Sequence, residues 1–143
     1  MKKRFVIHEH HASRLHFDLR LEMEGVFRSW AVPKGPSMNP ADKRLAVLQP
    51  DHALSYGDFE GTLPEGTYGA GEVRIWDKGK YETDGDPAKQ FVEGKIEFRF
   101  IGKKLEGEFT LVRMAKQKNN WLLIKGRDEF ADPKWKIKTV LKV

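Results

Sequence analysis

The stretch from His8 to Glu22, HEHHASRLHFDLRLE, predicts the fold class of this chain. From Leu15 onward, apolar and polar residues alternate strictly. Successive side chains of a β-strand point to opposite faces, so this period of two indicates a strand with one apolar face. The opposite face carries His16, Asp18, Arg20 and Glu22. We therefore expect one side of the strand to pack against a core and the other to carry polar chemistry.

Short segments of the same kind recur along the chain. Residues 4–8 (RFVIH) precede this strand, and residues 26–32 (VFRSWAV) follow Glu24-Gly25, a pair typical of a tight turn. Further strands are expected at residues 44–50, 72–76, 95–100, 105–114 and 120–126. The last of them, NWLLIKG, is largely apolar throughout, as is typical of a central strand. Many short strands joined by glycine and proline turns favour a β-barrel or a β-sandwich.

Turn residues and weak helix signals mark the connections between these strands. Loops or turns are expected at residues 33–40, 58–71 and 77–79. The glycines Gly66, Gly69 and Gly71 are assigned to turn geometry, which glycine tolerates best. Short helical turns are expected at residues 39–45 and 86–94. In the second of these, proline lies near the start and glycine at the end, as helix boundaries prefer.

The composition is that of a soluble globular protein. The chain has 143 residues, of which 39% are hydrophobic and 33% charged, and it contains no cysteine. We expect one domain over residues 1–143. Without cysteine, a metal ion has to be bound by imidazole and carboxylate groups. No apolar run approaches the roughly 20 residues that a membrane helix needs, and no signal peptide is recognisable, so a cytoplasmic protein is expected.

The net charge of +5 comes from 26 basic and 21 acidic residues. Such an excess suits a polyanionic partner such as nucleic acid. Solubility alone explains the same excess, so charge leaves both interpretations open.

The polar face of the strand offers ligands for a metal ion. His16 and Asp18 share a face and lie about 6.6–6.8 Å apart along it, which lets their side chains meet at one ion. His10, six residues before His16, is the candidate third ligand. Imidazole and carboxylate suit a divalent ion such as Mn, Zn or Fe, and Arg20 beside it suits phosphate oxygens. The alternative is a strand with one solvated face and no ion.

Longer motifs in the chain carry a resemblance to a known family. They are H-x5-H-x-D-x-R-L-E from His10, SWAVPKGPS from Ser29, DHALSYGDFEG from Asp51 and PEGTYGAGEV from Pro64. In this order they resemble the 3′-phosphoesterase module of bacterial DNA ligase D and its free-standing archaeal and bacterial relatives. The likeness spans nearly the whole chain, including WLLIKGRDEFA near its end.

The resemblance implies a fold and an activity. The fold is mainly β, a single closed or nearly closed β-barrel of short antiparallel strands with few short helices. The activity is healing of DNA 3′ ends during break repair, by removal of a 3′-phosphate and of a terminal ribonucleotide to leave a 3′-hydroxyl. The implied cofactor is Mn²⁺, with Zn²⁺ or another divalent ion as the alternative occupant.

The resemblance also assigns residues and partners. The implied metal ligands match His10, His16 and Asp18, and the implied phosphate-binding pair matches Arg20 and His52. Further substrate-binding positions match Lys34, Arg44 and Tyr56. The implied partners are DNA or RNA-tailed DNA 3′ ends and a separate ligase, polymerase or end-binding protein, in a monomer of the bacterial or archaeal cytoplasm without membrane contact.

Some positions depart from the family pattern or stay open. His8 is expected to be an exposed histidine, with a spare metal ligand as the alternative. Glu22 is expected to pair with Arg20 or Lys34. The sequence begins a few residues before its first strand, whereas ligase-fused members carry an N-terminal arm that assists ribonucleotide removal. The resemblance therefore implies removal of the 3′-phosphate and leaves removal of a ribonucleotide open. No ligase or polymerase domain is recognised in the sequence, so a free-standing enzyme or an excised module is expected.

Two other classes of function fit the same residues less completely. A non-catalytic nucleic-acid-binding barrel would bind DNA in a salt-sensitive manner, indifferent to metal and to the chemistry of the 3′ end. A cupin-like small-molecule metalloenzyme would also use a histidine and carboxylate site in a barrel. Arg20 on the ligand strand favours phosphate chemistry over the latter.

Overall fold

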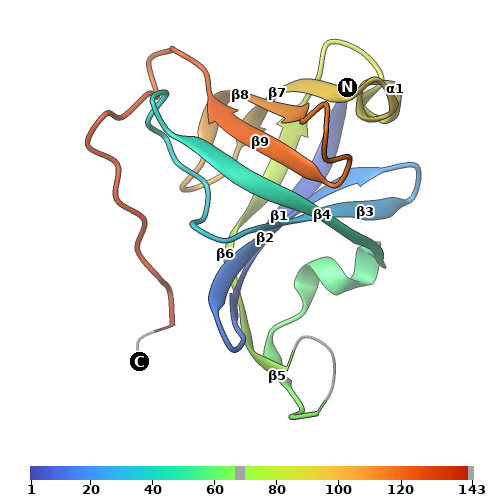
Figure 1. Cartoon of the computed structure of the whole chain (residues 1–143), viewed down its shortest axis with the longest axis vertical. Coiled ribbons are helices and arrows are strands. Elements are labelled where there is room, and N and C mark those ends of the chain that lie inside the picture. The colour runs from blue at the N-terminus through green and yellow to red at the C-terminus, as the bar shows by residue number, and fades with distance from the viewer. Residues whose placement is uncertain (67–69, 142–143) are drawn as a thin grey trace.

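Strand pairing dominates the computed structural model, which describes residues 1–66 and 70–141 (Figure 1). The strands are β1 (Lys2–His11), β2 (Leu15–Met23), β3 (Val26–Val32), β4 (Lys43–Ala53), β5 (Gly61–Leu63), β6 (Gly71–Glu82), β7 (Lys95–Ile101), β8 (Glu106–Arg113) and β9 (Asn120–Lys125). Within the described ranges, eight strands pair antiparallel in the order β1-β2-β3-β4-β9-β8-β7-β6, and β6 pairs back with β1. The predicted mainly β architecture and its closed barrel are confirmed.

Alternation along the strands places the core inside the barrel. In β2, Phe17, Leu19 and Leu21 are buried in one cluster with large side chains from the other barrel strands. The cluster includes Trp30, Trp76, Phe98, Phe100, Phe109 and Trp121. Because neighbouring residues of a strand point to opposite faces, the even-numbered residues of β2 lie on the outer face of the barrel.

The hairpin of β1 and β2 sets the register of that outer face. The strands are joined by residues 12–14, and His10 stands opposite His16 while His8 stands opposite Asp18. The expected turn at Glu24-Gly25 then leads into β3, with both residues at positive φ. Three neighbouring strands therefore present their polar side chains on one surface.

A segment after β4 crosses this outer surface. It consists of the 3₁₀ helix η1 (Leu54–Asp58) and continues to β5, which pairs with β6. We refer to residues 54–63 as the crossing segment; Figure 1 shows it at the end of the molecule opposite α1. Gly57 is required here, because a Cβ at this position would lie 2.7 Å from the ring of Phe27. The loop expected over residues 58–71 is thus partly wrong, since residues 61–63 form β5, and Gly69 lies outside the described residues.

The turn expected at residues 77–79 is wrong, because β6 runs unbroken through them. The register between β1 and β6 shifts at Trp76, which bulges between the partners of Ile7 and His8. Asp77 is buried and accepts hydrogen bonds from the backbone N–H groups of residues 103, 104 and 105. Its carboxylate therefore stabilises the turn between β7 and β8, while Gly79 permits close approach to the carbonyl of Ile101.

The two helical turns expected from the sequence have different outcomes. The second is confirmed as α1 (Pro87–Glu93), with the carboxylate of Asp86 accepting from the N–H of Ala88 and Gly94 ending the helix at φ 90°. The first is wrong: the side chain of Asn39 accepts from the N–H of Ala41 and holds a turn that leads directly into β4. Strand β4 also continues past Pro50, where the sequence predicted its end.

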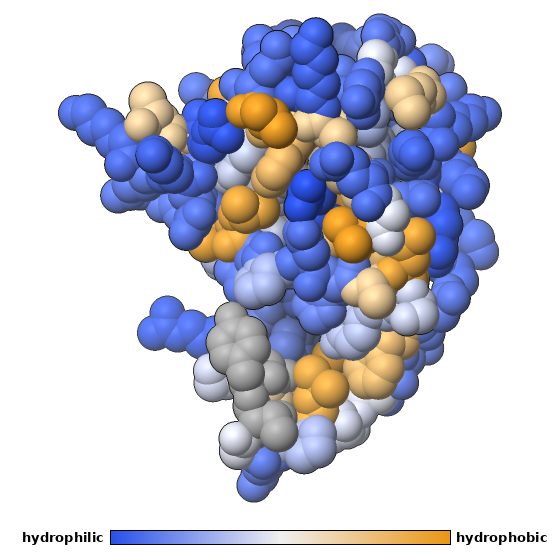
Figure 2. Space-filling model, turned by 90° about the vertical axis from the view of Figure 1, so that its right-hand side faces the viewer, coloured by the Kyte–Doolittle hydropathy of each residue, from blue (hydrophilic) through white to orange (hydrophobic). Residues whose placement is uncertain are grey.

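The C-terminal segment packs against the barrel as an irregular chain (Figure 1). Trp135 and Ile137 contact the core cluster, and the buried carboxylate of Glu9 accepts from the N–H groups of Val140 and Leu141. On the face shown in Figure 2, hydrophilic side chains predominate and hydrophobic ones form separate small groups. Among the described residues, no helix has the length and apolar character needed to cross a bilayer.

Candidate active site

The three predicted metal ligands converge on the outer face of β1 and β2. One ligand atom from each of His10, His16 and Asp18 lies within 4.8 Å of the others. His10 Nδ1 lies 3.4 Å from one carboxylate oxygen of Asp18, and His16 Nε2 lies 3.3 Å from the other. His10 and Asp18 are each only 7% exposed, so the barrel holds them away from bulk water. We refer to these three residues as the ligand group.

The hydrogen bonds of His16 favour a cation in this group. Its Nδ1 lies 3.2 Å from the carbonyl oxygen of Arg14, which accepts only and therefore places a proton on Nδ1. In a neutral ring, Nε2 then directs a lone pair at the carboxylate of Asp18. Two acceptors face each other favourably only when a proton or a metal ion lies between them. Imidazole nitrogens and carboxylate oxygens are common ligands of divalent ions such as Mn²⁺ and Zn²⁺, so these three residues fit a divalent ion.

Charges and hydrogen bonds in the ligand group lower the pKa of Asp18 and raise the pKa of His16. Burial opposes the charge of Asp18, but hydrogen bonds from His10 and His16 and the charge of Arg20 outweigh it. They hold the pKa of Asp18 well below its usual range. Burial also opposes the charge of His16, but the hydrogen bond to Asp18, the charge of Asp18 and the hydrogen bond to the Arg14 carbonyl together outweigh it and raise the pKa of His16 above 6.5. The carboxylate is thus ionised at neutral pH, as a metal ligand must be.

Arg20 lies beside the ligand group with its guanidinium nearly enclosed. The residue is 4% exposed and donates from Nη1 to Ser29 Oγ at 2.9 Å, while Nη2 lies 3.5 Å from Asp18. Its guanidinium carbon lies 5.0 Å from the ring centre of Tyr56. A planar guanidinium with N–H groups to spare binds phosphate oxygens in a fixed orientation.

His8 is not the exposed histidine that the sequence predicted. Its exposed fraction is 0%, because the crossing segment covers it: its Nε2 lies 3.1 Å from the carbonyl oxygen of Phe59. Its Nδ1 accepts from Arg20 Nε at 3.0 Å. Burial, assisted by the charge of Arg20, lowers the pKa of His8 to about 4, so the ring is neutral at pH 7. With both nitrogens engaged, His8 is not a spare metal ligand either.

An aromatic stack forms the wall of the site on the side of the crossing segment. The rings of His52 and Tyr56 stack at 4.4 Å between centroids, and those of Tyr56 and Phe59 stack at 5.0 Å. Burial is the main cause that lowers the pKa of His52, followed by the charge of Arg20. His52 is therefore neutral at pH 7, and a neutral imidazole still has one N–H group that can donate to an anion.

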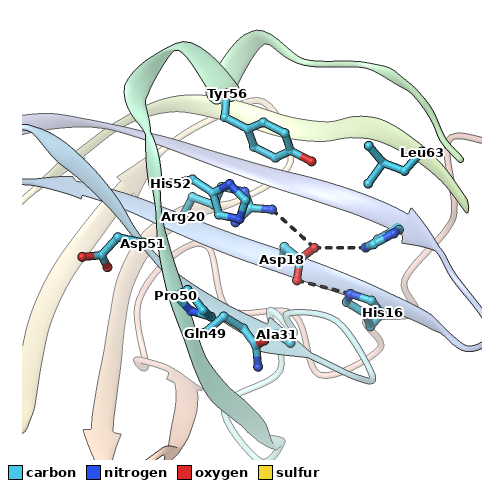
Figure 3. A pocket seen from close by; sticks show the side chains of 11 residues that line it. His16, Asp18, Arg20, Ala31, Gln49, Pro50, Asp51, His52, Tyr56 and Leu63 are labelled. Carbon is cyan, nitrogen blue, oxygen red and sulfur yellow. Dashed lines mark hydrogen bonds and ion pairs between the residues drawn. The ribbon is translucent and has the colours of Figure 1, made fainter. Parts of the chain in front are cut away.

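These residues surround one pocket of about 440 Å³. Figure 3 shows Asp18 between His16 and Arg20, with His52 and Tyr56 above them. The lining residues are His10, His16, Asp18, Arg20, Ala31, Gln49, Pro50, Asp51, His52, Tyr56 and Leu63. Charged groups gather at the ligand group, whereas Ala31, Pro50 and Leu63 supply apolar surface.

Some residues singled out in the sequence lie outside this pocket. Lys34 is exposed in the turn after β3, and Arg44 near the start of β4 lies 3.4 Å from Asp42. Neither lines the pocket, and their role toward a substrate stays a prediction. Glu22 accepts from the backbone N–H of Arg4 instead of pairing with Arg20 or Lys34 as expected.

We predict that His52 in the metal-free protein titrates below 6.5, so that it is neutral at pH 7 and becomes protonated as the pH falls. NMR titration of the imidazole resonances measures this pKa directly. Asp51 favours the protonated ring, so Asp51→Asn should lower the pKa further, whereas Arg20→Gln should raise it toward 6.5. A His52 pKa at or above 6.5 in the unsubstituted protein would contradict the half-buried position of this ring beside Arg20.

The site and the barrel together match a known class of domain. Residues 8–113 match the family model described as the DNA ligase D 3′-phosphoesterase domain, and the matched region contains the whole ligand group, Arg20 and His52. The chain belongs to this family.

Curated relatives agree with the family match. The chain is 46% identical over 127 residues to the multifunctional non-homologous end joining protein LigD of Pseudomonas aeruginosa, and 42% identical over 132 residues to that of Mycolicibacterium smegmatis. These alignments cover 87% and 88% of this chain but only 15% and 17% of the relatives. The chain thus spans about a sixth of the length of the proteins it matches.

Sequence reasoning missed two residues that hold Arg20 in place. His8 and Ser29 contact its guanidinium, and both are fully buried. The signal for His8 was present: a hairpin with a three-residue connection puts His10 opposite His16, and therefore His8 opposite Asp18. Ser29 could have been found from the turn at Glu24-Gly25. That turn sets the register between β2 and β3, in which Ser29 pairs with Arg20.

Proposed function

We propose that this chain is a divalent-metal-dependent phosphoesterase that removes a 3′-phosphate from DNA ends and leaves a 3′-hydroxyl. We further propose Mn²⁺ as its metal and DNA break repair by end joining as its process. The names of the relatives and of the matching family support the substrate class. All 143 residues are proposed to act as one domain.

The observation that carries this proposal is the position of a guanidinium beside a group of metal-ligand atoms in one pocket. Arg20 Nη2 lies 3.5 Å from Asp18, which itself lies between His10 and His16. A phosphate monoester brings two negative charges, and its hydrolysis shifts charge onto the leaving oxygen. A site for this reaction needs fixed positive groups on more than one side of the phosphorus.

The side chains of the chain divide this task between them. When bound to the ligand group, a divalent ion supplies Lewis acidity toward a phosphate oxygen or lowers the pKa of a bound water. Arg20 donates N–H groups to the remaining phosphate oxygens and fixes their orientation. His52 lines the same pocket, and burial together with the charge of Arg20 lowers the pKa of its ring. A phosphate dianion in the pocket would counteract the charge of Arg20 and favour the protonated ring, which can donate to the phosphate.

The rest of the pocket suits the nucleoside that carries the phosphate. Tyr56 stacks on His52, and Leu63 of β5 adds apolar surface near them. Outside the pocket, Lys34 and Arg44 are proposed to attract the DNA backbone, assisted by the net charge of +5.

A primer with a 3′-phosphate tests the proposal directly. With Mn²⁺, we expect conversion to a 3′-hydroxyl that a polymerase extends, and with a chelator we expect conversion to cease. A matched primer that already ends in a 3′-hydroxyl controls for the polymerase. DNA binding without conversion, unchanged by the chelator, would contradict the proposal and support a non-catalytic binding barrel.

A further inference from the structure

The guanidinium of Arg20 is held on its edges and on one face. Nε donates to His8, Nη1 donates to Ser29, and Nη2 lies next to Asp18. The ring of Tyr56 lies against the guanidinium at 5.0 Å. An arginine side chain has five N–H groups, so these three contacts leave two for the pocket that Arg20 lines.

His8 makes the contact that fixes the rotation of this group. Nε is the guanidinium nitrogen closest to the flexible part of the side chain, so an acceptor at Nε sets the plane in which Nη1 and Nη2 lie. His8 Nδ1 is that acceptor, at 3.0 Å. Its other nitrogen, Nε2, lies 3.1 Å from the carbonyl of Phe59, which can only accept. The two contacts together require a single tautomer, with Nδ1 bare and Nε2 protonated.

The same histidine connects Arg20 to the crossing segment. Phe59 directly follows η1, and Tyr56 of η1 contacts the face of the guanidinium. The rings of His8 and Tyr56 are also in contact, edge to face, at 5.3 Å between centroids. Arg20 on β2 and the aromatic wall above it are therefore both positioned through one buried imidazole on β1.

We propose that His8 is a positioning residue: by accepting from Arg20 Nε and donating to the Phe59 carbonyl, it holds the two remaining N–H groups of Arg20 toward a phosphate in the pocket. This inference rests on the proposed function of Arg20 as the phosphate-binding group. His8 itself touches neither the phosphate nor the metal ion.

Three variants of His8 separate hydrogen bonding from packing. In His8→Gln, the side-chain amide offers an oxygen to Arg20 and an N–H to Phe59, so both contacts can be kept. In His8→Leu, the volume is similar and both contacts are lost. His8→Asn provides a second test that stays polar, because its amide is one methylene too short to reach both partners. Thermal unfolding confirms that each variant is folded before it is compared.

The first measurement is the ¹H–¹⁵N signal of Arg20 Nε in the metal-free protein, assigned by its absence in Arg20→Lys. We expect a sharp signal in the unsubstituted protein and in His8→Gln, and loss of the signal through exchange in His8→Leu and His8→Asn. The second is hydrolysis of a 3′-phosphate primer. We expect kcat/KM to fall by about 10- to 100-fold in His8→Leu and His8→Asn, and by no more than about threefold in His8→Gln.

The outcomes distinguish this inference from the proposed function. An unsubstituted protein that does not hydrolyse the primer contradicts the proposed function, while the Arg20 signal still tests the positioning. If the primer is hydrolysed but His8→Leu and His8→Asn keep the Arg20 signal and full activity, the inference is wrong. Equal loss in His8→Gln and His8→Leu also overturns it, because packing alone would then explain the effect.

Discussion

Asp18→Asn is expected to reduce hydrolysis of a 3′-phosphate primer on the order of 10³-fold or more, with the fold retained. The substitution removes the carboxylate that lies between His10 and His16 and replaces a charged ligand by a neutral amide. It also removes the opposite charge nearest to Arg20, at 3.5 Å. Phosphate release at saturating Mn²⁺ measures the effect on activity, and calorimetric titration with Mn²⁺ measures the effect on metal binding.

A matched control separates the role of Asp18 from a change in net charge. Asp58 lies on the crossing segment but does not line the pocket, and its side chain is largely exposed. Asp58→Asn makes the same change in charge and should leave kcat/KM within about threefold. His10→Ala should behave as Asp18→Asn does. If both ligand variants retained activity, the metal assignment would fail.

Arg20→Lys is expected to lower kcat/KM by about 10² to 10³-fold at unchanged net charge, a loss comparable to that of one stabilising donor in a transition state. A lysine ammonium is a point charge without the planar fork of guanidinium. It cannot contact His8, Ser29 and Asp18 together and still offer two N–H groups to a phosphate. Steady-state kinetics on the same primer measure the loss, which should appear in kcat as well as in KM.

Arg99→Lys is the control for this substitution. Arg99 lies on β7 and pairs with Glu82 and Asp84, and none of these three residues lines the pocket. Its conversion to lysine should change kcat/KM by no more than about threefold. Comparable activity of Arg20→Lys and the unsubstituted protein would show that a single positive charge is sufficient and that the planar group has no special role.

The local part of the fold was predictable because it depends on a short-range pattern. The strict alternation in residues 15–22 identified β2 and divided its side chains between the core and the outer face. The proximity of His16 and Asp18 follows from that period alone. The addition of His10 needed only a short hairpin, and the structure does bring the side chains of these three residues together.

The crossing segment was not predictable in the same way. It consists of a short 3₁₀ helix and a three-residue strand, which have no sequence periodicity to detect. Its course depends on contacts distant in sequence, such as the close approach of Gly57 to Phe27 and the pairing of β5 with β6. The expectation that His8 is exposed was wrong for this reason, since the segment that buries it could not be placed.

Side chains that replace a backbone partner were also misread. Asp77 precedes Lys78-Gly79, a combination that commonly forms a turn, but its carboxylate binds the N–H groups of a neighbouring hairpin. The assignment of Lys34 and Arg44 as substrate-binding residues rests on the family likeness alone and stays a prediction, because no local sequence pattern shows which way a side chain in a turn or at a strand end points.

The placement of the pocket outside the barrel has a practical meaning for anyone who alters this protein. Along β2, His16, Asp18 and Arg20 line the pocket, whereas Phe17, Leu19 and Leu21 pack in the core cluster. Substitutions meant to alter the proposed chemistry and substitutions meant to alter core packing can therefore be chosen on opposite faces of the same strand.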